Sequence, residues 1–152
     1  MAQYYYLISS LPSIAPDVEL ALTLDEFMAQ CTDWLDEAEM RQLSELDLIP
    51  EIADDNRPAA APGVVAAWND WETCLRNALA RHRAAVSGQD VDAALRPEVD
   101  CYAEIVSGIQ EAWSQSDPLE REKVLYRLRW NFLDSLEGNH HFDFTRLAVY
   151  KL

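Results

Sequence analysis

Hydrophobic residues recur every three or four positions along most of this chain, which is the spacing of one face of an α-helix. The longest pattern runs from Val64 to Val86, where apolar and aromatic residues form one stripe and polar residues fall largely outside it. A second long stripe covers residues 118–137. Shorter patterns of the same kind occupy residues 24–35, 36–46, 91–95, 99–114 and 143–152. The pattern therefore predicts an all-α protein.

Residues that begin and end helices flank these patterns. A capping box, in which a threonine or aspartate is followed three residues later by a glutamate, stabilises a helix start because each side chain bonds the other's backbone N–H. The arrangement occurs at Thr23–Glu26, Asp36–Glu39 and Asp117–Glu120. Pro118 at the first helical position strengthens the last of these signals. Gly88 and Gly138 follow the two long patterns and predict their ends.

The chain opens with QYYYLISSLP at residues 3–12, a stretch that fits either a helix or a strand. A helix would place four apolar or aromatic side chains on one face: Tyr4, Leu7, Ile8 and Leu11. Because no second convincing strand is available for pairing, we expect a helix. Tyr5 and Tyr6 would then flank the apolar face. We expect the tyrosines to pack the N-terminus across the C-terminal helices, the alternative being an aromatic patch for a partner.

These elements predict one all-α domain, an irregular helical bundle of five to seven helices with no sheet of consequence. A length of 152 residues suits a single domain. Within it we distinguish an acidic N-terminal part at 1–49, a linker at 50–62 rich in proline, alanine and charge, and a main helical part at 63–152. We expect the two long helices to pack antiparallel. The last pattern is still running at Leu152, so we expect either a longer natural chain or a helix that ends against a partner.

Charge narrows the classes of partner. The chain carries 27 acidic and 12 basic residues, a net charge of −15, which repels nucleic acid and anionic lipid. Residues 1–60 hold 13 acids against two bases, so this part is predicted to be either a solvated surface or one that faces a basic protein. No stretch approaches the roughly 20 apolar residues of a membrane span, and no signal-peptide pattern opens the chain. We therefore expect a cytoplasmic protein that does not insert directly into a membrane.

Cysteine and histidine residues supply the candidate chemistry. Three widely spaced cysteines without a C-x-x-C pair indicate reduced thiols: Cys31, Cys74 and Cys101. His82 falls on an apolar helix face. We expect its side chain to bond to backbone rather than to act as a general base. A pairing of Cys74 with His82 is excluded because eight helical residues separate them by ~12 Å. Phosphate-binding and nucleophile-elbow glycine motifs are missing from the sequence.

Asn139-His140-His141, followed by Asp143, is the cluster that most resembles a set of metal ligands. A metal-dependent hydrolase using His140, His141 and Asp143 is one alternative function. Adjacent histidines in a turn point in different directions, however, and a metal site requires three or four convergent ligands. We therefore expect a polar turn between helices. The prediction is a protein without catalytic residues, cofactor or metal.

Four basic residues lie within nine positions of one another and form a basic patch: Arg121, Lys123, Arg127 and Arg129. We expect this patch to pair within the molecule with the acidic N-terminal part, the alternative being a surface for a partner. A stand-alone acidic adaptor, binding a basic protein surface through residues 17–55, is a second alternative function.

Three blocks, in this order, resemble one protein family: QYYYLISSLPSI at 3–14, WNDWETCLRNALARHRA at 68–84, and DPLEREKVLYRLRWNFLDSLEGNHHFDFTRLAVYKL at 117–152. It is an uncharacterised bacterial family whose members are encoded among V-type ATPase subunits and are similar to the C/d subunit of the V-type ATPase. The C/d subunit is an all-helical, non-catalytic socket on the membrane rotor that receives the central shaft.

The resemblance implies a non-catalytic subunit or an accessory or assembly factor of a bacterial V-type ATPase. Its partners would be protein subunits of that complex, and it would lie in the cytoplasm, peripheral to the inner membrane. The residues expected to contact a partner are Tyr5, Tyr6, Arg121, Arg127, Arg129 and Trp130.

Overall fold

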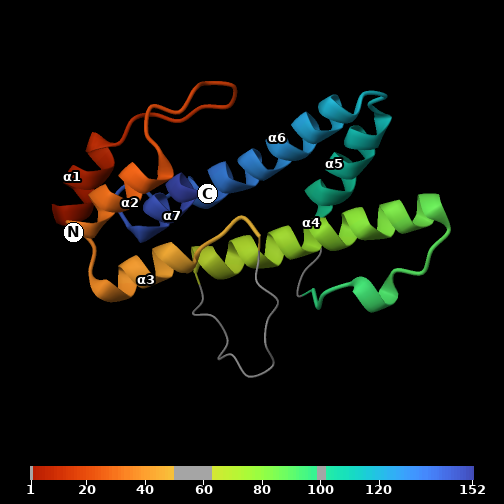
Figure 1. The fold of residues 1–152 in the computed structure, drawn as a ribbon, viewed down its shortest axis with the longest axis horizontal. Coiled ribbons are helices and arrows are strands. Elements are labelled where there is room, and N and C mark those ends of the chain that lie inside the picture. Colours follow the sequence, from red (N-terminus) through yellow and green to blue (C-terminus); the bar gives the residue numbers. More distant parts are fainter. Residues whose placement is uncertain (1, 50–62, 99–101) are drawn as a thin grey trace. The chain divides into compact units, whose positions relative to one another are not determined.

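A computed structural model describes residues 2–49, 63–98 and 102–152 (Figure 1). Three features of the sequence analysis lie outside these residues: the predicted linker at 50–62, the predicted helix start at Val99, and Cys101. All the regular elements in the described part of the chain are helices, with no strand among them, which confirms the all-α prediction. Its elements are α1 (Ala2–Ser10), α2 (Leu24–Thr32), α3 (Glu37–Glu45), α4 (Val64–Ser87), the 3-10 segment η1 (Asp92–Ala94), α5 (Ala103–Ser114), α6 (Pro118–Glu137) and α7 (Phe144–Lys151).

The chain forms two compact units, which we describe separately. Unit 1 comprises residues 1–48 and 132–152, and unit 2 comprises residues 49–131. The C-terminal segment therefore belongs with the N-terminal helices, whereas the sequence suggested parts that follow one another along the chain. That the whole chain is one domain stays a prediction.

The predicted capping boxes ahead of α2 and α3 are present, and at the start of α6 Asp117 accepts from the Leu119 N–H at 3.0 Å while Glu120 pairs with Lys123. Thr23 accepts from the Glu26 N–H at 3.3 Å, and the Glu26 carboxylate accepts from the Thr23 N–H at 2.9 Å. Backbone and side-chain hydrogen bonds from Thr23 hold the pKa of Glu26 below its ordinary value. Asp36 and Glu39 form the same reciprocal pair ahead of α3. Gly88 ends α4 in the left-handed region, with φ of 70°, a conformation that glycine adopts without strain.

The core of unit 1 joins its first and last helices. Five side chains with at most 2% of their surface exposed form its centre: Leu7, Phe27, Cys31, Leu43 and Leu147. Both α1 and α3 pack against α7. This confirms the helical interpretation of QYYYLISSLP and the packing of α1 across a C-terminal helix. Of the three tyrosines only Tyr4 packs against the core, whereas Tyr5 and Tyr6 are exposed. Tyr150 of α7 adds a hydrogen bond from its hydroxyl to the Pro12 carbonyl at 2.8 Å.

Lys151 holds the end of α3 in unit 1. Its Nζ donates to the carbonyls of Leu43 at 2.7 Å, Ser44 at 3.2 Å and Leu46 at 2.5 Å. The last carbonyls of a helix have no partner within the helix, and a cation there also offsets the negative end of the helix dipole. A residue more than 100 positions away in the chain therefore completes α3.

Alkaline pH is expected to destabilise unit 1 through Cys31. Burial raises the pKa of this thiol from 9.0 to about 11. A raised pKa in the folded state contributes stability that is fully present below pH 9 and is lost as the pH rises through about 11. In urea unfolding at pH 8 to 11, the stability advantage of the wild type over Cys31→Ala should shrink by on the order of 2 kcal/mol. A constant difference between the two proteins up to pH 11 would contradict this.

Unit 2 is built on the packing of α4 against α5. Trp68, Trp71 and Leu75 of α4 are fully buried, and Ile105 of α5 is 1% exposed. The sequence suggested α4 and α6 as the antiparallel pair, but α5 is the principal neighbour of α4. Gly108 allows α6 to pack closely against α5, because a Cβ at this position would lie only 2.6 Å from a methyl carbon of Leu128.

Candidate functional site

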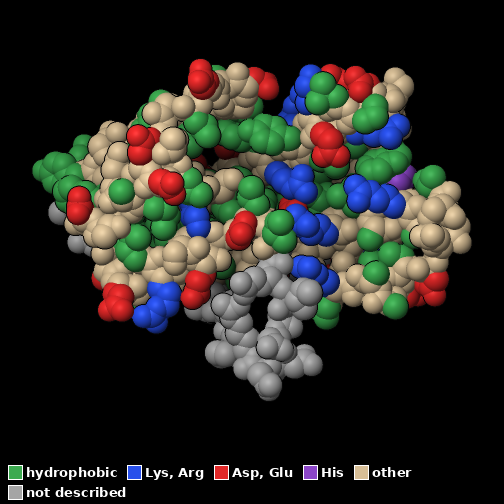
Figure 2. All heavy atoms as spheres, viewed as in Figure 1, with side chains coloured by type: hydrophobic (Ala, Val, Ile, Leu, Met, Phe, Trp, Pro, Cys, Tyr) green, Lys and Arg blue, Asp and Glu red, His purple; other side chains and the backbone are tan. Residues whose placement is uncertain are grey.

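Four exposed aromatic side chains form a continuous row on unit 1, here called the aromatic row: Tyr5, Tyr6, Trp34 and Phe142. Their exposed fractions range from 39% for Trp34 to 64% for Tyr6. Ring centroids are separated by 4.8 Å for Tyr5–Phe142, 5.8 Å for Tyr5–Tyr6 and 6.2 Å for Tyr6–Trp34. Hydrophobic side chains protrude over α1 at the left edge of Figure 2. Aromatic rings in contact with one another and with water are suited to bind a partner.

Helix geometry accounts for the two tyrosines of the row. Leu7 faces the core, and successive residues of a helix are rotated by about 100°, so Tyr5 and Tyr6 turn away from it. The other two members come from turns. Trp34 was expected on the apolar face of a helix reaching residue 35, but α2 ends at Thr32 and leaves Trp34 exposed. Leu24, the first residue of α2, is also exposed, at 55%.

Three carboxylates of unit 1 act on Tyr4, which precedes Tyr5 in α1. The Tyr4 hydroxyl donates a hydrogen bond to Glu39. Burial raises the pKa of the Tyr4 phenol, and Glu39, Asp36 and Asp143 raise it further through their negative charges. The phenol therefore stays neutral while three carboxylates surround it. Unit 1 as a whole contains 13 acidic and three basic residues, so the aromatic row lies in a strongly negative field.

The basic residues of α6 contact groups inside unit 2. Arg129 donates twice to the fully buried Glu72, with both nitrogen–oxygen distances at 2.9 Å, and Arg76 donates to the same carboxylate at 2.9 Å. The expected pairing with the acidic N-terminal part is therefore wrong for Arg129. The sequence signal that was missed is Glu72 itself, a carboxylate within the tryptophan-rich part of the α4 pattern. Its burial requires a cationic partner.

The remaining predicted partner residues lie along α6 in unit 2. Arg121 donates to the Gln115 carbonyl at 2.9 Å and lies over the ring of Trp113, 5.9 Å from its centroid. Arg127 is exposed. Trp130 is partly buried and contacts Tyr126, with 6.1 Å between ring centroids. Tyr5 and Tyr6 thus belong to one surface and the α6 residues to the other compact unit.

The histidine-rich turn contains a pair rather than a triad. His140 Nδ1 lies 2.5 Å from Asp143 Oδ2, while His141 is exposed. Asp143 also begins α7 by accepting from the Arg146 N–H at 3.2 Å. Across the residues that the structure covers, no three histidine, cysteine or acidic side chains are grouped as metal ligands.

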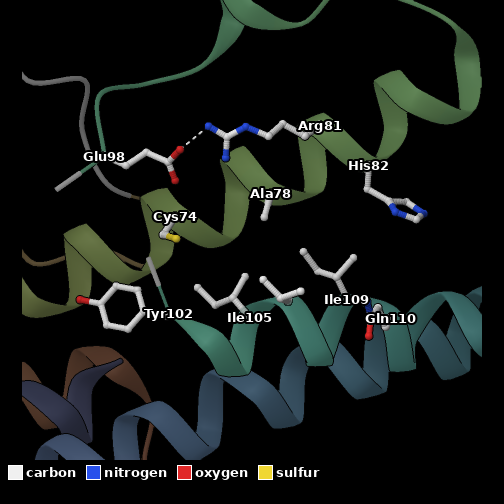
Figure 3. Close-up of a pocket in the computed structure, with 10 residues that line it drawn as sticks. Cys74, Ala78, Arg81, His82, Glu98, Tyr102, Ile105, Ile109 and Gln110 are labelled. Atoms are coloured by element: carbon white, nitrogen blue, oxygen red, sulfur yellow. Dashed lines mark hydrogen bonds and ion pairs between the residues drawn. The ribbon is translucent and has the colours of Figure 1, made fainter. Parts of the chain in front are cut away.

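A cavity of about 690 Å³ opens in unit 2 between α4, the segment after η1, and α5 (Figure 3). Ala78, Ile105 and Ile109 line its apolar part, and an ion pair between Arg81 and Glu98 lies at its edge. The hydrogen bond from Arg81 is the main cause that lowers the pKa of Glu98.

A buried amide fixes the segment that carries Glu98. The side chain of Asn77, only 3% exposed, donates to the Arg96 carbonyl at 2.7 Å and accepts from the Arg96 N–H at 3.0 Å. These two hydrogen bonds hold the backbone of Arg96 against α4, and with it the segment that lines this side of the cavity.

His82 also lines the cavity, and its environment differs from the one expected. Its ring packs on Trp113, with 4.4 Å between centroids. Its Nε2 atom is buried and, among the described residues, has no hydrogen-bond partner. The expected bond to backbone is therefore not made by this atom. Cys74 lines the same cavity two helical turns away, too far to act with His82 as a pair.

Comparison with known proteins did not identify a function for this chain. None of the helices in the described ranges combines the length and hydropathy needed to span a bilayer. No family model, curated protein or solved structure matches this chain.

Proposed function

We propose that this chain is a non-catalytic, protein-binding subunit or accessory factor of a bacterial V-type ATPase. The observation that carries the protein-binding role is the aromatic row, four rings in successive contact that are between 39% and 64% exposed. Aromatic residues are enriched in the fully buried centre of protein interfaces and account for much of their binding energy. The class of partner comes from the resemblance of the three sequence blocks to the family similar to the C/d subunit.

Charge supports a basic contact surface on that partner. Tyr6 and Trp34 offer ring faces to lysine or arginine side chains, and such cation–π contacts strengthen when water is excluded. The charges of Asp36 and Glu39, which act on the Tyr4 phenol, add to the negative charge of unit 1 that would attract such cations. A partner with arginines among apolar residues would match both features. Bound in this way, the protein would be peripheral to the inner membrane and held there by the complex.

A stand-alone acidic adaptor that binds a basic protein surface through residues 17–55 is the second candidate, and the excess of ten negative charges on unit 1 favours it. The two functions differ in which proteins are bound and in the response to salt. Binding dominated by charge should weaken steeply as ionic strength rises, whereas contacts centred on buried aromatic rings should persist.

The test is affinity purification from the native host with the wild type and with Tyr6→Ala/Trp34→Ala. We expect the wild type to recover V-type ATPase subunits. The double variant should recover at least tenfold less of these subunits, because two large exposed rings are removed. Circular dichroism should show both proteins equally folded. Tyr126→Ala, which removes a ring that is 50% exposed on α6, is the matched control and should retain the partners.

Two results would count against the proposal. Failure of the wild type to recover any ATPase subunit would end the ATPase assignment. Recovery that is unchanged in the double variant but lost with Tyr126→Ala would move the interface to α6.

A further inference from the structure

Helix α6 carries apolar side chains on the side turned away from the core as well as on its core side. Leu125 is 2% exposed, and Leu128 lies against Gly108 of α5. Leu119 and Tyr126, by contrast, are 61% and 50% exposed. They are seven residues, or two helical turns, apart, so they share one face on the side opposite Leu128. A surface helix normally presents polar residues on that side, and an apolar face there is typical of an interaction site.

Trp130 extends this exposed face towards the end of unit 2. It follows Tyr126 by four residues on the same side of the helix, and the two ring centroids are 6.1 Å apart. Leu119, Tyr126 and Trp130 are here called the outer face of α6. Tyrosine and tryptophan are enriched in protein interfaces relative to the rest of the surface.

Charged residues border the outer face in a pattern that repeats after seven residues with the sign reversed. On one edge Glu120 is followed by Arg127, and on the other edge Glu122 is followed by Arg129. Both edges of the face are therefore acidic in the first half and basic in the second half. Residues seven apart are separated by about 10 Å along a helix, so the acid and the base of one edge do not pair with each other.

Some of these charges are not compensated within one copy of the chain. Glu122 and Arg127 are exposed, and neither makes an ion pair with another described residue. Arg129 shares the single carboxylate of Glu72 with Arg76, so two cations face one anion. The face thus offers both signs of charge to a partner.

A second copy of the chain in the antiparallel direction matches this pattern. A two-fold axis between antiparallel helices brings each edge of one helix against the same edge of the other, with the chain direction reversed. The acidic half of each copy then lies beside the basic half of the other. Glu120 faces Arg127 on one edge, and Glu122 faces Arg129 on the other. The apolar residues of the two outer faces cover each other between these edges, whereas a parallel pair would oppose like charges.

We infer that the outer face of α6 binds a second copy of this chain in an antiparallel, two-fold symmetric dimer. One helix pair buries less surface than a standard interface, so the dissociation constant should be on the order of 10–100 µM. This pairing is separate from the protein-binding role proposed for unit 1, and neither depends on the other.

Sedimentation velocity of the full chain measures this association over protein concentrations of about 5 to 500 µM. At a salt concentration of about 0.15 M, screening confines the repulsion between two copies of net charge −15 to charges within about 8 Å. We expect the wild type to pass from monomer to dimer over this range. Tyr126→Ala should weaken dimerisation at least tenfold, because the two-fold symmetry removes the ring at two places in the interface.

Charge-reversal variants test the antiparallel arrangement. Glu120→Lys and Arg127→Glu each place like charges opposite one another, so each variant alone should dimerise at least tenfold more weakly. A 1:1 mixture of the two variants restores opposite charges at both places and should dimerise within about threefold of the wild type. Arg41→Glu makes the same change at an exposed arginine of α3 and is the matched control, which should dimerise like the wild type. Circular dichroism should show all these proteins equally folded.

Four results would overturn the inference. The first is a wild type that stays monomeric up to about 500 µM. The second is dimerisation that Tyr126→Ala leaves unchanged, which would place the contact elsewhere on the chain. The third is unchanged dimerisation of the two single charge variants, and the fourth is a mixture that associates as weakly as either variant alone.

Discussion

Replacing Glu72 with glutamine is expected to lower the free energy of unfolding by about 3 kcal/mol or more. The side chain of Glu72 is fully buried and accepts three hydrogen bonds from Arg76 and Arg129. Glutamine has nearly the same shape but no charge, so Arg129, 26% exposed, and Arg76, 39% exposed, lose the buried anion that both pair with, and an amide replaces it in a site built to donate three hydrogen bonds. Urea unfolding followed by circular dichroism measures the change.

Glu120→Gln is the matched control for this substitution. It makes the same chemical change, but Glu120 is 48% exposed and pairs with Lys123 three residues away on α6. Exposed ion pairs contribute about 1 kcal/mol or less. Equal losses in the two variants would show that burial of Glu72 does not set its contribution. Adding Arg129→Met to Glu72→Gln should cost less than the sum of the single changes, because both belong to one network.

Replacing Trp68 with alanine is expected to lower the free energy of unfolding by about 3–5 kcal/mol. Trp68 is fully buried on α4 and stacks on Trp71, with 5.9 Å between ring centroids. Removal of the indole loses its apolar burial and leaves a cavity that the surrounding helices can only partly close. The same urea unfolding experiment, with the tryptophan fluorescence of the remaining indoles as a second probe, gives the magnitude.

Trp34→Ala is the control, and it also connects stability with function. Trp34 is 39% exposed in the aromatic row, so its truncation should cost about 1 kcal/mol or less. The two tryptophans should therefore separate cleanly, with Trp68 required for folding and Trp34 for partner recovery. A loss of stability from Trp34→Ala as large as that from Trp68→Ala would place Trp34 in the core and remove it from the proposed interface.

Local signals in the sequence predicted most of the helices because their causes span only a few residues. Thr23 with Glu26, Asp36 with Glu39, and Gly88 act within one helical turn of the position that they mark. The residues that make these contacts lie next to one another in the sequence, so they can be recognised without knowing the rest of the fold. The same locality explains why Tyr5 and Tyr6 could be placed beside the apolar face of α1 rather than on it: their position follows from the face that contains Leu7.

The candidate sites depend on contacts between residues far apart in the chain, and the sequence pattern does not specify these. Trp34 is a good helix-face residue by spacing, and only the early end of α2 and the positions of α1 and Phe142 make it part of a surface. Glu72 becomes buried because Arg129, 57 residues later, supplies the charge that permits it. For these residues, the hydrophobic pattern of the sequence alone is compatible with many possible partners.

By itself the sequence determined that this protein is all-α, where most of its helices begin and end, and that its charge is strongly negative, because hydrophobic spacing, capping and composition are properties of short segments or of simple totals. Only the tertiary structure decided that residues 132–152 complete the core of the N-terminal helices, that four aromatic rings meet on one surface, and that His82 borders a cavity. These are choices among distant partners, and they are made by the packing of whole helices.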